Sequence, residues 1–275
     1  MRPQSMVFTL YGDYVRHVGG KISIGALVRL LTPFGVSEQA IRSVVSRMKR
    51  NGQLQVEREG NNSCYSLTES SAQTVEQAAV RIFHAHSPRD HWDGNWRLVT
   101  YSIPEKERAA RDRLRHELGW LGFGMFANGL WMSPHNYTRE VEQLADALDM
   151  RSRIEVFTAH HNGFSDNQTI VQRCWNLSAI NERYAAFIAK YQPMYEDHCR
   201  ALGQHQDLEP SQYFVNRFTL IHEYRRFPFK DPELPQELLP ADWRGIEAMN
   251  LFRQYHDLLA EKATAFFDKI YQNGK

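Results

Sequence analysis

The side chains of residues 37–50 separate by chemical type onto two faces of a predicted helix. Apolar residues recur at the spacing i, i+3, i+4, i+7, which predicts one buried face. They are Ile41, Val44, Val45 and Met48. The opposite face carries the polar and basic residues Ser37, Gln39, Arg42, Ser43, Ser46, Arg47 and Arg50. Arginine can form two hydrogen bonds with guanine, and glutamine two with adenine, so this face suits the reading of DNA bases.

Position along this helix divides the expected contacts. Helix-turn-helix proteins insert the N-terminal end of their second helix into the major groove, so the first residues of the face are expected to contact base edges. Arg47 and Arg50, nearer the C-terminal end, are expected to contact phosphates. The alternative is an ordinary amphipathic helix with a solvated basic face.

The elements around this helix favour the DNA-reading interpretation. Apolar spacing predicts helices over residues 6–16 and 22–31, and residues 32–35 (TPFG) form a turn. Ser37 then caps the next helix, because a serine oxygen can accept a hydrogen bond from a free amide of the first turn. Helix, turn and helix therefore follow one another as a helix-turn-helix requires.

A predicted hairpin follows this helix. Residues 53–58 and 63–67 alternate in polarity like two strands, and residues 59–62 (EGNN) have the composition of a turn. Arg58 in the first strand and Asn61 at the tip are expected to reach the neighbouring groove or the DNA backbone. The hairpin completes the pattern of a winged helix-turn-helix.

Charge is distributed unevenly along the chain. The 275 residues carry a formal net charge of +1, but residues 1–67 hold nine Lys and Arg against four Asp and Glu, which gives +5 there and −4 in the remainder. A basic first quarter on a near-neutral protein is what a DNA-contacting module needs.

Two polar, turn-rich stretches divide the chain, residues 87–95 (SPRDHWDGN) and 162–167 (NGFSDN). We therefore predict an α+β protein with a winged helix-turn-helix domain at 1–87, a ferredoxin-like βαββαβ domain at 88–162 and a C-terminal helical effector and dimerisation domain at 163–275. The helices of the last part are expected at 168–190, 195–202, 213–227 and 246–272. This division predicts that removal of residues 1–87 leaves a folded remainder.

Several segments resemble known families. Residues 36–54 (VSEQAIRSVVSRMKRNGQL) resemble the recognition helix of GntR-type winged helices. Three parts of the chain resemble the PaaX family of phenylacetate-degradation repressors. Residues 10–13 (LYGD) resemble the start of that family, and residues 92–96 (WDGNW) resemble its central domain. Its C-terminal block is matched by residues 220–226 (LIHEYRR) and 230–243 (KDPELPQELLPADW). The similarity extends over almost the whole chain.

The resemblance implies a transcriptional repressor of aromatic-acid catabolic genes that releases DNA when an aryl-CoA thioester, typically phenylacetyl-CoA, binds. It also implies a homodimer on a palindromic operator of double-stranded DNA, which suits the small number of base pairs that one recognition helix reads. Some relatives have a longer C-terminal tail than this chain.

A CoA ester needs cations for its phosphates and an apolar slot for its aryl group. Residues 222–230 (HEYRRFPFK) offer both, and arginine suits phosphate bidentately. The predicted effector-binding residues are His222, Tyr224, Arg225, Arg226 and Lys230. The alternative is a surface helix end with its aromatic residues packed inward. Trp92 and Trp96 are expected to pack within a domain.

No catalytic motif of the GxSxG, P-loop or HExxH type occurs, so we expect no catalytic residues and no cofactor. Ferredoxin-like domains can support metal-dependent nuclease chemistry through an acidic residue at the end of the first strand, but residues 96–105 (WRLVTYSIPE) lack such an Asp. A metal-dependent nuclease-like enzyme stays an alternative, as does a non-enzymatic scaffold whose winged helix binds protein.

A cluster of potential ligands lies in the first predicted linker: His84, His86, Asp90, His91 and Asp93. We expect no physiological metal there, because side chains on a linker are not held in one coordination geometry. The cysteines Cys64, Cys174 and Cys199 form no CxxC pair, which is typical of a reducing compartment. No apolar run approaches the roughly 18 residues of a membrane span, and the N-terminus lacks the pattern of a signal peptide, so a cytoplasmic protein without membrane contact is expected.

Overall fold

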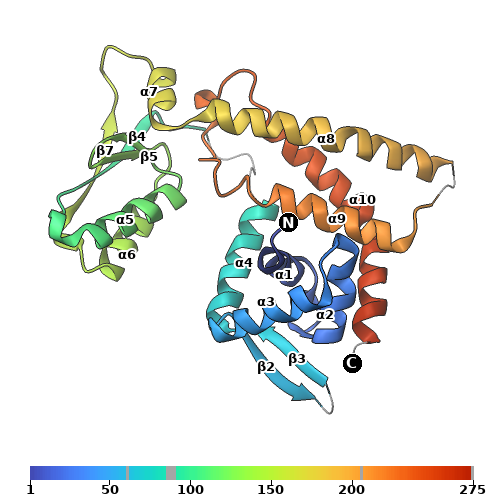
Figure 1. The fold of residues 1–275 in the computed structure, drawn as a ribbon. Coiled ribbons are helices and arrows are strands. Elements are labelled where there is room, and N and C mark those ends of the chain that lie inside the picture. The colour runs from blue at the N-terminus through green and yellow to red at the C-terminus, as the bar shows by residue number, and fades with distance from the viewer. Residues whose placement is uncertain (60–61, 85–90, 205–206, 274–275) are drawn as a thin grey trace. The chain divides into compact units, whose positions relative to one another are not determined.

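The computed structural model describes residues 1–59, 62–84, 91–204 and 207–273. The chain forms two compact units (Figure 1). Unit 1 comprises Met1–Ala85, Phe187–Arg225 and Glu247–Lys275, and unit 2 comprises His86–Ala186 and Arg226–Ile246. The described residues contain no helix that is both long and apolar enough to cross a membrane. Helices together with two antiparallel sheets make this an α+β fold.

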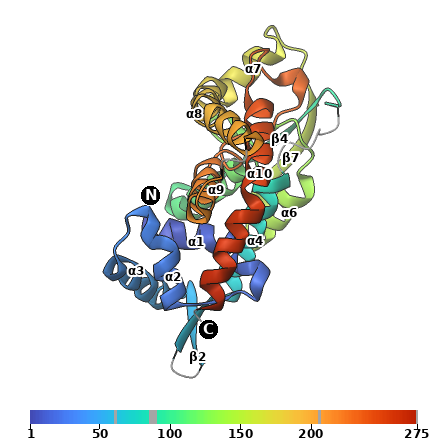
Figure 2. The ribbon, with the colours of Figure 1, turned by 90° about the vertical axis from the view of Figure 1, so that its right-hand side faces the viewer.

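The N-terminal segment of unit 1 begins with helices and ends in a hairpin and a further helix. Its elements are α1 (Pro3–Asp13), β1 (Lys21–Ser23), α2 (Ile24–Leu31), α3 (Glu38–Arg50), β2 (Leu54–Glu59), β3 (Asn62–Leu67) and α4 (Glu69–His84). The strands form an antiparallel sheet in the order β1-β3-β2. The β2–β3 hairpin extends away from the helices of this unit (Figure 2).

Local chemistry explains where these helices begin. Ser23 Oγ accepts a hydrogen bond from the Ala26 amide at 3.2 Å, and Ser37 Oγ accepts one from the Ala40 amide at 3.3 Å, as N-cap serines do. Gly35 has a φ of 76°, a left-handed conformation that glycine adopts without strain and that turns the chain between α2 and α3. The predicted helix at 6–16 instead begins at Pro3 and ends at Asp13, followed by a 3-10 turn at Val15–Val18.

The rest of unit 1 comes from the C-terminal part of the chain. It consists of residues 187–203 of α8 (Leu177–Gly203), α9 (Pro210–Tyr224) and nearly all of α10 (Gly245–Gln272). Aromatic side chains join these helices to the N-terminal segment, with ring centroids 5.2 Å apart for Tyr14 and Phe214 and 4.5 Å apart for Phe34 and Phe218. The N-terminal segment and the C-terminal helices therefore share one core, while the predicted domain boundaries at 87/88 and 162/163 stay predictions.

The helices predicted at 168–190 and 195–202 are wrong in extent. The chain forms α7 (Asn167–Cys174), breaks at Trp175, and then continues as α8 from Leu177 to Gly203. Trp175 has extended backbone angles, and Asn176 Oδ1 accepts a hydrogen bond from the Ala179 amide, so α8 starts with a new cap. Pro193 removes one hydrogen bond from α8 without ending it.

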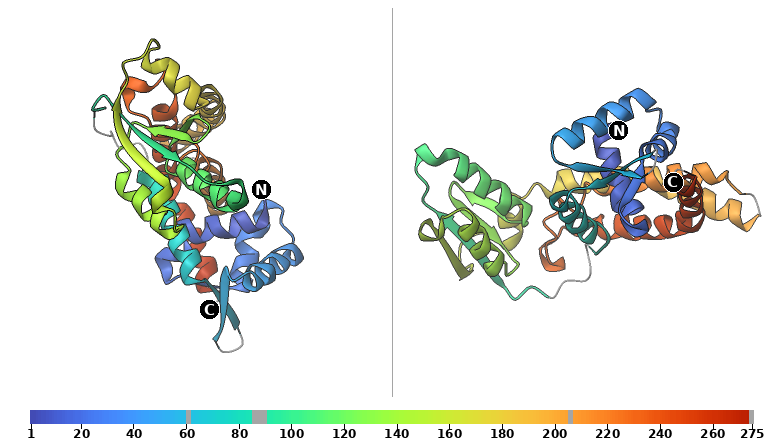
Figure 3. Two further views of the ribbon diagram at one scale, coloured as in Figure 1. Left: turned by 90° about the vertical axis from the view of Figure 1, so that its left-hand side faces the viewer. Right: turned by 90° about the horizontal axis from the view of Figure 1, so that it is seen from below.

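Unit 2 is built on a four-stranded antiparallel sheet in the order β5-β6-β4-β7 (Figure 3). Its elements are β4 (Asn95–Tyr101), α5 (Arg108–Trp120), β5 (Gly124–Ala127), β6 (Leu130–Ser133), α6 (Thr138–Ala147) and β7 (Ile154–His160). This βαββαβ order and strand arrangement are those of the predicted ferredoxin-like fold.

The two faces of this sheet pack against different helices. Val99, Trp131 and Ile154 face one core, which contains Leu114 of α5 and Val141 of α6. The alternate residues Trp96 and Met132 face a second core with Ile170 and Val171 of α7. Successive strand residues point to opposite faces, so the same strands serve both cores.

Candidate nucleic-acid interface and effector residues

Helix α3 presents its polar face to solvent. Ile41, Val44, Val45 and Met48 are buried, as the spacing predicts. All the α3-face residues predicted to contact DNA are exposed: Ser37, Gln39, Arg42, Ser43, Ser46, Arg47 and Arg50. The structure therefore brings these side chains together on one surface. Among them, Ser37 has its hydroxyl engaged in capping α3.

Arg42 lies near the middle of this surface and is paired within its own helix. Its Nε donates a hydrogen bond of 2.7 Å to Glu38 Oε1, four residues earlier. Both side chains are more than half exposed, so solvent screens the pair and its contribution to stability is small. A phosphate or a guanine edge can replace Glu38 as the partner of this guanidinium with little loss of folding stability.

The structure describes Arg58, one of the two hairpin residues that the sequence predicts to contact DNA. Arg58 is exposed on β2. Asn61 lies outside the described residues. On the same strand as Arg58, Glu57 Oε2 lies 2.5 Å from Lys21 Nζ of β1.

Sequence reasoning missed a buried polar group that joins α1 to the C-terminal helices of unit 1. Asp13 Oδ1 accepts a hydrogen bond of 3.2 Å from Arg217 of α9, and the side chains of both residues are at least nine-tenths buried. The Arg217 atom that donates this bond is Nη2, and it also lies 2.9 Å from Nε2 of His256 on α10. Because arginine only donates, Nε2 of His256 is the acceptor in this contact.

The predicted effector residues His222 and Arg225 extend this polar seam. His222 is buried, and its Nδ1 lies 2.9 Å from Thr9 Oγ1 of α1. Arg225 donates a hydrogen bond to Ser5 Oγ at the start of α1. The α1 partners, Ser5, Thr9 and Asp13, recur every four residues, which places them on one side of α1 facing α9. We call these contacts the α1–α9 seam.

The other predicted effector residues lie in unlike surroundings. Tyr224 is fully buried and stacks on Phe252 of α10 with ring centroids 3.9 Å apart. Arg226 and Lys230 are exposed and belong to unit 2. The five residues are thus divided between a buried core in unit 1 and an exposed segment of unit 2, and effector binding by them stays a prediction.

Part of the predicted linker cluster can be placed. His91 Nδ1 lies 2.9 Å from Glu237 Oε1, and Asp93 pairs with Arg97 at 2.6 Å. Hydrogen bonds from Arg97 and from the Asn95 amide lower the pKa of the Asp93 carboxyl well below its usual range. His86, Asp90 and the His84 side chain lie outside the described residues. Within the described parts of the chain, no group of three or more His, Cys, Asp or Glu side chains is arranged to hold a metal ion.

Trp92 and Trp96 pack inside unit 2, as predicted. Their rings meet edge to face with centroids 5.1 Å apart, and Trp96 also stacks with Trp175 at 6.3 Å. The Trp92 indole donates a hydrogen bond to the Asn95 carbonyl. These contacts hold the start of β4 against Trp175, the residue that follows α7.

Comparison with known proteins covers nearly the whole chain. Residues 2–71 match the family described as PaaX-like protein, residues 89–171 the PaaX protein central Cas2-like domain, and residues 175–269 the PaaX-like protein C-terminal domain. The chain is 33% identical over 265 residues to the transcriptional repressor PaaX of Escherichia coli (strain K12), a match that covers 95% of this chain and 82% of that protein.

A solved structure supports the fold. The uncharacterized protein Rv0674 from Mycobacterium tuberculosis superposes with a TM-score of 0.63 at 22% identity, covering 95% of this chain and 97% of that one. At this identity the likeness concerns the fold alone. The matches to all three parts of one family, in order, together with a full-length relative at 33% identity, show that the chain belongs to the PaaX family.

Proposed function

We propose that this protein is a DNA-binding transcriptional repressor and not an enzyme. The observation that carries the proposal is the exposed polar and basic face of α3 above a fully buried apolar face. The helix α2 and its turn precede this face, and the β2–β3 hairpin follows it, which is the order of a winged helix-turn-helix. The printed name of the Escherichia coli relative supports the same role.

The finer parts of the proposal follow from the family. We propose that the protein acts in the cytoplasm as a homodimer on a palindromic operator near aromatic, phenylacetate-type catabolic genes. We propose further that an aryl-CoA thioester such as phenylacetyl-CoA relieves repression. Such a ligand must bind the arrangement that cannot hold DNA more tightly than the one that can, because only differential affinity shifts an equilibrium.

The test is binding of the full-length protein to the intergenic DNA upstream of its own gene at fixed salt, with and without phenylacetyl-CoA. Tight binding that the thioester releases, but that free phenylacetate or free CoA does not release, is the expected result. Tight binding that is unaffected by the thioester would keep the repressor and reject the effector. Absence of sequence-specific binding at moderate salt would reject the DNA-binding role itself.

A further inference from the structure

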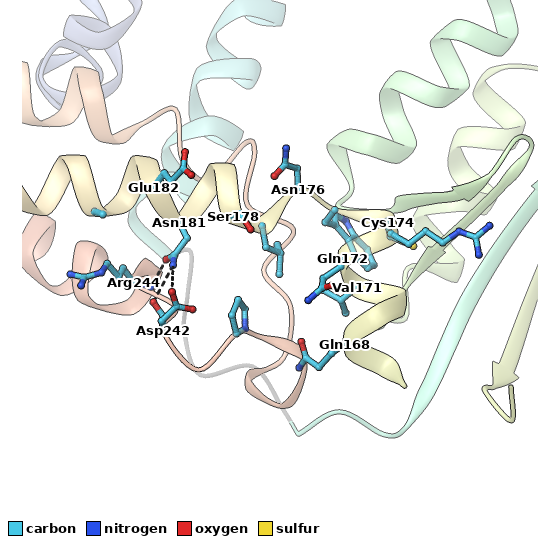
Figure 4. A pocket seen from close by; sticks show the side chains of 15 residues that line it. Gln168, Val171, Gln172, Cys174, Asn176, Ser178, Asn181, Glu182, Asp242 and Arg244 are labelled. Atoms are coloured by element: carbon cyan, nitrogen blue, oxygen red, sulfur yellow. Dashed lines mark hydrogen bonds between the residues drawn. The ribbon is translucent and has the colours of Figure 1, made fainter. Parts of the chain in front are cut away.

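Polar side chains that line a surface can be used by the fold itself or left available to a partner. Unit 2 contains an open cleft of about 1000 Å³ whose wall is of the first kind (Figure 4). There Asn181 accepts a hydrogen bond of 2.8 Å from the Arg244 amide and donates one of 3.1 Å to the Asp242 carbonyl. The polar face of α3 is of the second kind, because its residues are exposed. Among them is Glu38, which is not one of the predicted DNA contacts.

Glu38 is the one acidic residue of α3. The other charged residues of this helix are basic and exposed, namely Arg42, Arg47, Lys49 and Arg50. Glu38 stands in the first turn, at the end that helix-turn-helix proteins insert into the major groove. Phosphates along the groove repel a carboxylate, so an acid at this end weakens binding to DNA unless it meets a hydrogen-bond donor.

Helix capping does not account for the Glu38 carboxylate. The cap of α3 is Ser37, whose Oγ accepts from the Ala40 amide. An acid that returns a hydrogen bond to the cap residue stands three places after it, and Ala40 occupies that place. Glu38 does interact favourably with the positive end of the helix dipole, as does Glu69 in the first turn of α4. That interaction adds stability but gives no preference for one DNA sequence.

The structure holds the carboxylate one helical turn from Arg42. Glu38 Oε1 accepts the 2.7 Å hydrogen bond from Arg42 Nε. The two side chains are 57% and 53% exposed, so each can exchange the other for a DNA group at small cost. When the Arg42 guanidinium turns to a guanine, the carboxylate loses its donor. Inside an interface that excludes water, Glu38 then needs a new one.

The major-groove edge of a G·C pair offers what both side chains need. Guanine presents two acceptors, N7 and O6, which match two donors of an arginine guanidinium. Cytosine presents its N4 amino group, which donates to a carboxylate. Thymine has the acceptor O4 at the corresponding place, and guanine has acceptors there as well, so neither can satisfy a carboxylate.

We propose that Glu38 is a specificity-determining residue, which accepts a hydrogen bond from the N4 amino group of a cytosine while Arg42 bonds to a guanine of the same or a neighbouring base pair. The proposal rests on the proposed DNA-binding function. Where thymine or guanine replaces that cytosine, the carboxylate has no donor and the phosphates repel it. Glu38 therefore lowers affinity for wrong sites more than for the operator, and specificity is the difference between the two affinities.

The first test compares the affinities of full-length variants for two DNA fragments by fluorescence anisotropy at fixed salt. One fragment is the intergenic DNA upstream of the protein's own gene, and the other is a shuffled sequence of the same composition. Glu38→Ala removes the carboxylate, and Glu38→Gln removes its charge but keeps one acceptor oxygen. Glu69→Gln is the matched control, because Glu69 is likewise exposed in the first turn of a helix. Urea denaturation measures the effect of each change on stability.

We expect the wild type and Glu69→Gln to have the same ratio of operator affinity to shuffled-DNA affinity. In Glu38→Ala this ratio should fall by about tenfold, because one base contact is lost and binding to the shuffled DNA becomes tighter. Glu38→Gln should show a smaller fall. An unchanged ratio in both Glu38 variants would overturn the role of Glu38 and leave DNA binding intact. A wild type that does not distinguish the two fragments would overturn the proposed function as well.

The second test identifies the contacted atom. Each cytosine of the operator fragment is replaced in turn by 2-pyrimidinone, a base that lacks the amino group at position 4, while the opposite guanine is kept. At the contacted cytosine the wild type should lose affinity several-fold, whereas Glu38→Ala should lose little, because its contact is already absent. Equal losses for the two proteins at every cytosine would overturn the contact between Glu38 and a cytosine amino group.

Discussion

At the scale of single residues, exposure and partners decide which side chains are available for function. Arg42 is exposed and pairs with an exposed carboxylate on its own helix, so a DNA group can take the place of Glu38. His222 and Tyr224 have the residue types of a ligand site, but both are buried and packed against helices of unit 1.

Replacing Arg42 with alanine is expected to weaken specific operator binding by about 5- to 150-fold. This range corresponds to the roughly 1–3 kcal/mol that a good bidentate contact with a base contributes. Fluorescence anisotropy with operator DNA and with a shuffled sequence of the same composition measures the effect. Arg183→Ala, an exposed arginine on α8, is the control. An operator preference identical to that of the wild type would show that Arg42 reads no base.

The cysteines are expected to react at different rates with iodoacetamide. Cys199 is exposed, whereas burial raises the pKa of Cys174 to about 12, so at pH 8 Cys174 has very little thiolate. Mass spectrometry over a time course should find Cys199 modified well before Cys174 in the folded protein. In urea the two should react at similar rates. Equal rates in the folded protein would contradict the half-buried position and the raised pKa of Cys174.

At the scale of elements, the α1–α9 seam contains a buried pair of opposite charges. A charged pair buried between two helices is weak evidence for net stability, but loss of one partner leaves the other charge buried and uncompensated. Asp13 and Arg217 form such a pair, and the Arg217 guanidinium also lies 4.9 Å from the centre of the Tyr14 ring. The seam therefore fixes how α1 sits against α9.

Arg217→Met is expected to lower the free energy of unfolding by about 3–5 kcal/mol, because Asp13 then stays buried without its cation. Urea denaturation measures the change, with the exposed Arg183→Met as the control. The double variant Asp13→Asn with Arg217→Met should recover part of the loss, because no charge is then left buried. A loss below about 1 kcal/mol in the single variant would show that solvent reaches Asp13.

A second element-scale prediction concerns pH. Burial lowers the pKa of His198 on α8, and its Nδ1 lies 2.7 Å from the Tyr255 hydroxyl of α10. The pKa of His198 in the folded protein lies below the value of about 6.5 expected in the unfolded chain. As the pH falls through about 6.5, the unfolded chain therefore takes up a proton that the folded protein does not yet bind, and the free energy of unfolding decreases. The free energy of unfolding should fall between pH 7.5 and 5 more steeply for the wild type than for His198→Gln. Parallel curves would contradict the prediction.

At the scale of the whole molecule, the N-terminal segment and the C-terminal helices of unit 1 depend on each other. Arg29 of α2 donates a hydrogen bond to the Ile270 carbonyl near the end of α10, and the Tyr271 hydroxyl donates one to the Val18 carbonyl. Together with the aromatic contacts of Tyr14 and Phe34, these bonds tie both ends of the chain into one core.

Removal of residues 1–87 is therefore expected to destabilise the remainder, in contrast to the independent folding that the three-part division of the sequence suggests. Phe214, Phe218 and Phe267, which are buried in the intact protein, would lose their partners on the N-terminal segment. Thermal unfolding followed by circular dichroism should show a lower Tm for the truncated chain than for the intact protein. A truncated protein with unchanged helical content and Tm would show that this core does not need the N-terminal segment.

The local pattern was sufficient for α3 and for the hairpin of β5 and β6. Helical spacing identified the buried face of α3, and Ser37 marked its start, because both signals arise within a few residues of each other. The turn Asn128–Gly129 likewise set β5 beside β6, since two-residue turns of this type join adjacent antiparallel strands. Exposure of the predicted DNA-contacting residues on α3 followed from the same periodicity.

Tertiary structure alone decided the α1–α9 seam. Asp13 and Arg217 are 204 positions apart, and nothing local distinguishes a buried arginine in α9 from an exposed one. The spacing of residues near the end of α9 likewise did not show that Thr9 of α1 would lie against His222. Sequence periodicity determines which face of a helix is apolar, but the partner that covers the face depends on the packing of distant segments.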